Sequence, residues 1–80
     1  MTVYVDDPKI PLGRMKMCHM FADTEDELHD MAEDLGLKLA WFQGDHYDVS
    51  LAKRKLAVSM GAKEVTSLDL VELRRQRRND

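Results

Sequence analysis

Hydrophobic positions in this chain follow two different periods along its length. Val3–Val5 is a short β-favouring run, and Met15–Ala22 is a longer, mostly apolar run that predicts a buried strand. Residues 24–36 instead repeat their apolar positions every three or four residues, which predicts an amphipathic helix. Between the first two runs, residues 6–13 hold both prolines and predict a loop that is neither a helix nor a central strand.

The helix over residues 24–36 has the clearest boundary signals. Thr24 with Glu27 three residues later is a capping box, which predicts the start of the helix. Gly36 predicts its end, because glycine readily adopts the left-handed conformation that closes a helix, and Leu37 supplies the usual hydrophobic contact after it. The spacing predicts one buried face, formed by Leu28, Met31, Ala32 and Leu35.

A second strand and helix pair is predicted over residues 39–61. The apolar run Leu39–Phe42 predicts a strand, and residues 43–45 predict a turn. Either Asp48 or Ser50 can cap the following helix, and Gly61 predicts its end. The apolar positions expected on this helix are Val49, Ala52, Leu56 and Met60.

The last third of the chain predicts a weak strand at residues 64–66 and a final helix. Thr66 or Ser67 can cap that helix, with Leu70, Val71 and Leu73 facing inward. We therefore expect an α/β fold in the order β-β-α-β-α-β-α, with a small, mainly parallel four-stranded sheet and about three helices. Eighty residues suffice for one core, so we predict a single domain over residues 1–73 and an arginine-rich helix end or tail over residues 74–80.

The charged residues are unevenly distributed along the chain. The net charge is −3, but residues 1–50 carry 11 acidic against 4 basic side chains, and residues 51–80 carry 4 against 8. The basic end predicts either an interaction tail or a helix that keeps the chain in solution. The lone Cys18 excludes an internal disulfide and a cysteine-based zinc site, and no signal sequence or membrane-spanning run is found, so we expect a cytoplasmic protein.

Carboxylates follow several of the predicted strands. In an open α/β sheet, ligands bind beyond the carboxyl ends of the strands. Asp6, Asp23 and Asp48 lie at such positions and are candidate ligands for Mg²⁺ or Mn²⁺, which prefer carboxylate oxygens. The alternative is that Asp23 belongs to an ordinary helix cap and that Asp6 lies in an exposed acidic loop.

The segment His46-Tyr47-Asp48 is the densest group of reactive side chains. It precedes a predicted helix N-terminus, where backbone N–H groups favour anions, so His46, Tyr47 and Asp48 are candidate phosphate-binding residues. Arg14 and Arg54 are candidate counter-charges for that anion. The alternative places His46 in a solvated turn, with Tyr47 and Asp48 in helix capping.

His19 lies inside the apolar run and shares one face of the predicted strand with Met17 and Phe21. Such a histidine is either a hydrogen-bonded core residue or a ligand, and it becomes a site candidate if its ring reaches His46 or Asp6. His46, His19 and Asp48 are accordingly the candidate catalytic residues, with histidine as general acid or base. No P-loop, dinucleotide-binding, nucleophile-elbow or zinc-protease motif is found.

Several ordered segments of the chain are similar to a known family. These are MTVYVDD, GRMKMCHMFAD, ELHDMAEDLGL, and WFQ closely followed by HYD, and then Arg54 with Leu56-Ala57 and Gly61-Ala62. The similarity covers about residues 1–66. They resemble a family of short bacterial and phage proteins that is described as a domain of unknown function. The resemblance implies no activity, but its motif positions include His19 and residues 46–48.

The leading functional hypothesis is a small domain that binds a phosphate-bearing ligand, either a nucleotide or a nucleic-acid end, at the carboxyl edge of the sheet. The alternatives are a metal-dependent phosphodiesterase or nuclease, and a phage or bacterial factor that binds a host or bacterial protein. A sheet this small has exposed edge strands that can pair with a second copy of the chain, so a homodimer is a further alternative.

Overall fold

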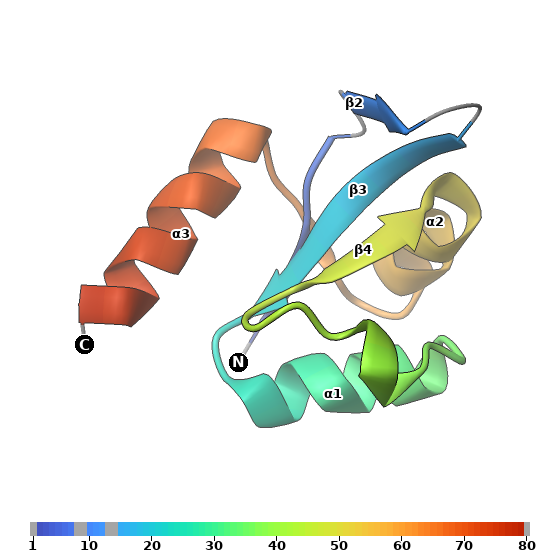
Figure 1. Ribbon diagram of the computed structural model, residues 1–80, viewed down its shortest axis with the longest axis horizontal. Helices are drawn as coiled ribbons and strands as arrows, with labels where there is room; N and C mark the ends of the chain where they lie inside the picture. The colour runs from blue at the N-terminus through green and yellow to red at the C-terminus, as the bar shows by residue number, and fades with distance from the viewer. Residues whose placement is uncertain (1, 8–9, 13–14, 80) are drawn as a thin grey trace.

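The computed structural model describes residues 2–7, 10–12 and 15–79, which form three layers (Figure 1). Helices α1 and α2 cover one face of a mixed sheet, and α3 lies on the other side. In chain order the elements are β1 (Val3–Val5), β2 (Ile10–Leu12), β3 (Met15–Ala22), α1 (Glu25–Asp34), the 3₁₀ helix η1 (Leu39–Trp41), β4 (Tyr47–Ser50), α2 (Leu51–Ser59), β5 (Lys63–Glu64) and α3 (Ser67–Asn79).

The sheet is built around β3, the longest strand. β1 pairs with the end of β3 and β2 with its beginning, both antiparallel and along the same edge, while β4 pairs antiparallel along the other edge. β5 pairs parallel to β1. The sheet of five strands is therefore four strands wide, because β1 and β2 share one position beside β3. Pro11 is compatible with β2 because that strand lies at an edge.

The prediction of a mainly parallel sheet is wrong, since β1 with β5 is the one parallel pair among the described residues. The cause lies after α1, where Leu39–Phe42 was expected to be a strand. Leu39–Trp41 instead forms η1, and the chain returns along α1 to the end of the sheet where β3 finished (Figure 1). Tyr47 therefore pairs with Met20, and β4 runs back along β3 in the antiparallel direction.

Helix α1 confirms its predicted boundaries. The Thr24 hydroxyl accepts from the backbone N–H of Glu27 at 3.3 Å and donates to the carboxylate of the same residue at 3.0 Å. Gly36 has a φ of +77°, and the N–H of Leu37 donates to the carbonyl of Ala32 at 2.8 Å, which is a Schellman closure. Leu28, Ala32 and the C-cap Leu35 are buried, as the apolar spacing predicts.

Helix α2 differs from the prediction in its buried face. Ser50, not Asp48, is the N-cap, since its hydroxyl accepts from the N–H of Lys53 at 3.2 Å. Val49 consequently lies in β4, and the expected apolar stripe loses its first member. Ala57 is buried while Leu56 stays exposed, because hydrogen bonds from Lys53 and Arg54 draw their side of the helix inward.

Helix α3 begins at the predicted place. Thr66 and Asp69 form a reciprocal cap, in which each backbone N–H donates to the other side chain at 3.3 and 3.1 Å. Leu70 is buried as expected and Leu73 is half-buried, but Val71 is exposed. The basic residues of the last turns face the sheet in part, since Arg77 donates to the carbonyl of Ala22 at 3.1 Å.

The core lies between the sheet and the pair α1 and α2. It contains buried side chains from the sheet, from the two helices and from the turns next to them, namely Val5, Cys18, Met20, Ala22, Leu28, Ala32, Leu35, Tyr47, Val49, Ala57 and Ala62. No helix in the described ranges is long and apolar enough to cross a membrane.

Candidate metal centre

The first part of the site lies at the break between β1 and β2. Asp6 immediately follows β1 and is 2% exposed. Its N–H donates to the carbonyl of His19 at 3.1 Å, and its Oδ1 accepts from the N–H of His19 at 2.6 Å, so the carboxylate replaces a backbone acceptor of the sheet. The other oxygen, Oδ2, lies 2.8 Å from Nδ1 of the His19 ring.

The second part repeats this arrangement on the turn before β4. Nδ1 of His46 lies 2.7 Å from Oδ1 of Asp45. Asp45 is held in turn by Arg74 from α3, whose Nε and Nη2 donate to the two carboxylate oxygens at 2.8 and 3.0 Å. Burial alone would raise the pKa of Asp45, but the hydrogen bonds from Arg74 and His46 outweigh it and hold that pKa below its usual value.

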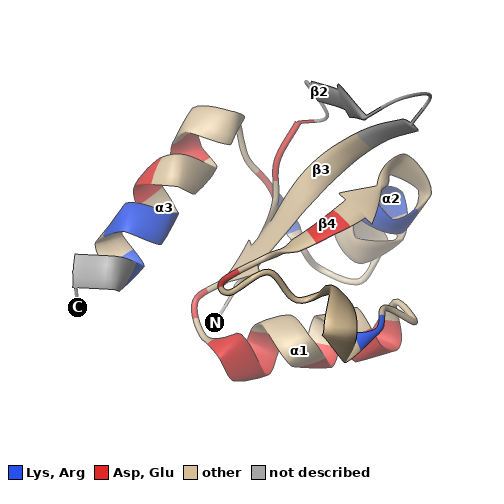
Figure 2. Cartoon of the chain, viewed as in Figure 1, with Lys and Arg blue, Asp and Glu red and all other residues tan. Residues whose placement is uncertain are grey.

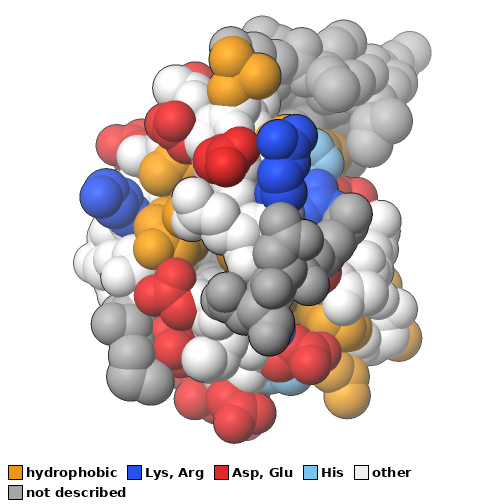
Figure 3. Space-filling model, turned by 90° about the vertical axis from the view of Figure 1, so that its left-hand side faces the viewer, with side chains coloured by type: hydrophobic (Ala, Val, Ile, Leu, Met, Phe, Trp, Pro, Cys, Tyr) orange, Lys and Arg blue, Asp and Glu red, His pale blue; other side chains and the backbone are white. Residues whose placement is uncertain are grey.

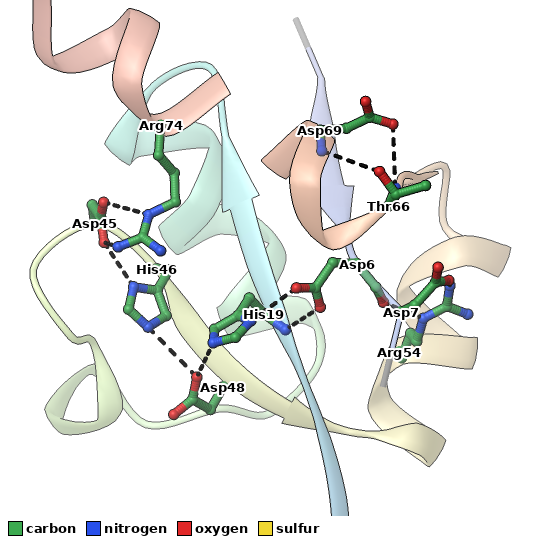
Figure 4. A network of polar contacts seen from close by, with 10 residues as sticks. All are labelled: Asp6, Asp7, His19, Asp45, His46, Asp48, Arg54, Thr66, Asp69 and Arg74. Atoms are coloured by element: carbon green, nitrogen blue, oxygen red, sulfur yellow. Dashed lines mark hydrogen bonds and ion pairs between the residues drawn. The ribbon is translucent and has the colours of Figure 1, made fainter. Parts of the chain in front are cut away.

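The two histidines meet at Asp48, which is paired with His19 in the register of β3 and β4. Asp48 Oδ1 lies 3.7 Å from Nε2 of His19 and 3.5 Å from Nε2 of His46 (Figure 4). The ring centroids are 5.2 Å apart in an edge-to-face arrangement. Gln43 donates to the other oxygen of Asp48 at 2.8 Å, which fixes the carboxylate with Oδ1 toward the histidines.

These three side chains have the features of a metal centre. One potential ligand atom each from His19, His46 and Asp48 lies within 4.8 Å of the others. Nδ1 of each histidine contacts a carboxylate, so Nε2 is the ring nitrogen that can bind a metal ion. Metal-binding histidines are typically oriented by such a carboxylate. Bonds of about 2.0–2.2 Å in a tetrahedral site place neighbouring ligand atoms about 3.3 Å apart, close to the two separations from Asp48.

The charges around the centre favour a cation. Asp6, Asp45 and Asp48 supply three carboxylates, and among the described residues Arg74 is the one arginine or lysine that forms an ion pair with any of these carboxylate groups. Figure 2 shows acidic residues on β4 and on the loop before it, basic residues on α2, and both kinds on α3. Because charges of the same sign repel most when they are partly buried, a divalent ion would lower the energy of this cluster.

The structure separates the candidate phosphate-binding residues from one another. Tyr47 is buried against α1, where its hydroxyl lies 2.8 Å from Nδ1 of His29, and burial raises the pKa of that phenol. Arg54 donates to the carbonyl of Asp6 at 2.8 Å and to Glu64 at 2.9 Å. The predicted counter-charge Arg14 lies outside the described residues.

The candidate metal ligands are only partly brought together. Asp48 belongs to the centre, and Asp6 supports it through His19. Asp23 is used elsewhere, since its oxygens accept from the backbone N–H of Thr2 and from the hydroxyl of Tyr4, both at 3.0 Å. Burial, as the largest cause, and the hydrogen bond to Asp23 raise the pKa of Tyr4.

Three supporting residues are not among the site residues predicted from the sequence, namely Gln43, Asp45 and Arg74. The acid next to His46 was a usable signal for Asp45, because a carboxylate beside a histidine can orient its ring. Arg74 is 29 residues from Asp45, and no local pattern joins the two.

One comparison with known proteins identifies the family of this chain. A family model described as a protein of unknown function (DUF4031) matches residues 3–77. The chain belongs to the DUF4031 family. This confirms the resemblance seen in the sequence, and the match includes every residue of the candidate centre and most of α3. Searches of curated proteins and of solved structures found no significant match.

Proposed function

We propose that this DUF4031 domain binds one divalent transition-metal ion through His19 Nε2, His46 Nε2 and Asp48 Oδ1. The observation that carries the proposal is the pair of carboxylate–histidine contacts, at 2.8 and 2.7 Å, which turn both Nε2 atoms toward one carboxylate oxygen. Two imidazoles and one carboxylate in a roughly tetrahedral spacing suit Zn²⁺ better than Mg²⁺ or Mn²⁺, which favour oxygen ligands in octahedral geometry.

We further propose that the bound ion serves the hydrolysis of a phosphate ester. Three protein ligands leave a fourth position for water or substrate, as in catalytic zinc sites. When bound, such an ion acts as a Lewis acid toward a phosphate oxygen and makes water a stronger nucleophile near neutral pH. Hydrolysis forms a bond from water oxygen to phosphorus, and the ester oxygen leaves with a proton from water.

This proposal combines the two leading sequence hypotheses. Arg54 and Tyr47 are engaged in structural contacts, so recognition of a phosphate group would rest on the ion itself. His46 and Asp48 then act as ligands, and His19 joins them, instead of serving as a general acid or base. A nucleotide or a nucleic-acid end is the phosphate-bearing ligand we propose, and binding without catalysis is the alternative.

The test is a calorimetric titration of metal-free protein with Zn²⁺, Co²⁺, Mn²⁺ and Mg²⁺. We expect one equivalent of Zn²⁺ or Co²⁺ to bind, and His46→Ala to weaken that binding at least tenfold. His29→Ala is the matched control, because His29 also contacts another side chain but lies outside the centre. Binding of Zn²⁺ that is equal in all three proteins contradicts the site.

Hydrolysis is tested separately with bis(4-nitrophenyl) phosphate, a general phosphodiester probe. We expect release of 4-nitrophenol by the Zn²⁺- or Co²⁺-loaded protein and none by His46→Ala. A loaded protein that binds the ion but releases no product with this probe or with a short oligonucleotide contradicts catalysis and favours the binding alternative.

A further inference from the structure

A cavity of about 310 Å³ lies between α3 and β3, next to the metal centre. Met17 from β3 and Leu70 and Val71 from α3 form its apolar walls, and Ser67 lies at the start of the same helix. The volume is at the lower end of the range for small-molecule sites. Val71 is half exposed, so this wall of the cavity reaches the surface.

The charged residues around this cavity are already paired. Asp6 is bound by the ring and backbone of His19, and Arg74 is bound to Asp45 by two hydrogen bonds. Asp7 lies 3.7 Å from a guanidinium nitrogen of Arg54. An ionic group inside the cavity would have to displace one of these partners, whereas an uncharged group would only replace water against apolar walls.

His19 connects the cavity to the metal centre. Its side chain is 40% exposed and lines the cavity, while Nε2 points to Asp48. A group in the cavity can therefore lie against the imidazole of a metal ligand. A ligand that spans both features has an anionic part at the ion and an uncharged part beside it.

We infer that this cavity binds a flat, uncharged aromatic group of the substrate, so that the substrate class is an aryl or nucleoside phosphate ester. The observation behind it is a cavity of about 310 Å³ with apolar walls that shares His19 with the proposed metal centre. The phosphate part of this inference rests on the proposed function, but the aromatic site does not. Val71 and Leu70 are then specificity-determining residues.

The aromatic site is tested without phosphate or metal. 1-Naphthalenemethanol is titrated into the full chain while the methyl resonances of Met17, Leu70 and Val71 are followed by NMR. We expect saturable shifts in these signals in the wild type and their loss in Val71→Trp, whose indole fills the cavity. Leu68→Trp is the matched control on α3, because Leu68 is 82% exposed and does not line the cavity.

The substrate class is tested with Co²⁺-loaded protein, whose visible spectrum reports ligands at the ion. Methylphosphonate, 1-naphthylmethylphosphonate and thymidine 5′-monophosphate are compared, the last two distinguishing an aryl from a nucleoside source. We expect at least one aromatic ligand to bind at least tenfold more tightly than methylphosphonate, and Val71→Trp to remove this advantage without changing Co²⁺ affinity.

The outcomes separate the two proposals. No saturable methyl shifts with 1-naphthalenemethanol overturns the aromatic site, whatever the metal does. Equal affinity for the three phosphonate or phosphate ligands also overturns it but leaves the metal centre intact. Shifts with 1-naphthalenemethanol in a protein that binds no Co²⁺ support the aromatic site and contradict the proposed function.

Discussion

The two faces of the sheet use the same strand for different purposes. On β3, Cys18, Met20 and Ala22 point toward α1 and α2 and are fully buried in an apolar core. The residues between them point toward α3, where His19 is part of a network of carboxylates and Phe21 packs under the guanidinium of Arg77. Alternation along one strand thus separates the residues that stabilise the fold from those available for chemistry.

The covering helices differ in the same way. Helix α1 contributes three buried apolar side chains with its C-cap, whereas Leu70 is the one fully buried side chain of α3 among its described residues. Two arginines of α3 add polar contacts, since Arg74 bonds Asp45 in the loop before β4 and Arg77 bonds the carbonyl of Ala22. The side of the molecule that α3 covers carries both acidic and basic groups at its surface (Figure 3). We infer that stability depends mainly on the α1 side.

The largest effect on stability is expected from Leu28→Ala on the α1 side. Leu28 is fully buried, so its truncation leaves a cavity in the core and should lower the free energy of unfolding by about 3 kcal/mol. Urea denaturation of the metal-free protein measures the change. Leu56→Ala on the exposed side of α2 is the control, and equal losses in the two variants would contradict the assignment of the core.

The second prediction concerns Asp6, which contributes both to the stability of the fold and to the candidate metal centre. Asp6→Asn keeps the shape but removes the charge that orients His19, so Zn²⁺ affinity should fall about 10- to 100-fold. Stability should fall by about 1–3 kcal/mol, since the buried contact with the N–H of His19 is weakened. Calorimetry and urea denaturation measure the two effects. Asp23→Asn is the matched control, and unchanged Zn²⁺ affinity in Asp6→Asn would exclude the orienting role.

The elements of the fold that could be predicted from the sequence are those whose sequence signal lies within the element itself. The apolar run at residues 15–22 and the caps at Thr24 and Gly36 lie within their own elements, and both elements are confirmed. Leu39–Phe42 is an apolar run of four residues, which fits either a strand or a short helix. Its packing on α1 decides the direction of β4, and that contact is not encoded in the run itself.

The same limit applies to the candidate centre. His19, His46 and Asp48 could each be selected as reactive side chains, and the possible meeting of His19 with His46 or Asp6 could be stated as a condition. The register that pairs His19 with Asp48 could not be predicted, because it requires the antiparallel pairing of β3 and β4. The expected parallel sheet directed attention to strand ends instead, and hence to Asp23.

A third prediction concerns the polar attachment of α3 through Arg74. Arg74→Gln removes two hydrogen bonds to Asp45, so we expect a loss of about 1 kcal/mol of stability near pH 6. The pKa of Asp45 is lowered in the folded state, so this stabilisation is present above the unfolded value of about 3.9 and is lost as the pH falls through the lower folded value. Urea denaturation from pH 6 down to about pH 3 measures it.

The difference between wild type and Arg74→Gln should therefore shrink toward acid pH. Arg75→Gln is the matched control, because Arg75 is exposed and its one described ion pair, with Glu72, lies within α3. A difference that stays constant over this pH range would show that Arg74 acts by packing and not through the charge of Asp45.

The smallest effect is expected on the outer surface of α3. Leu68 is 82% exposed, so Leu68→Ala should change the free energy of unfolding by less than about 0.5 kcal/mol. Leu70→Ala, two residues away, should cost more, because Leu70 is 2% exposed and contacts the sheet face. Urea denaturation at two protein concentrations compares them. If Leu68→Ala costs as much as Leu70→Ala and the cost grows with concentration, Leu68 is covered by a second copy of the chain, and the α3 face is then an interface instead of an open approach to the metal centre.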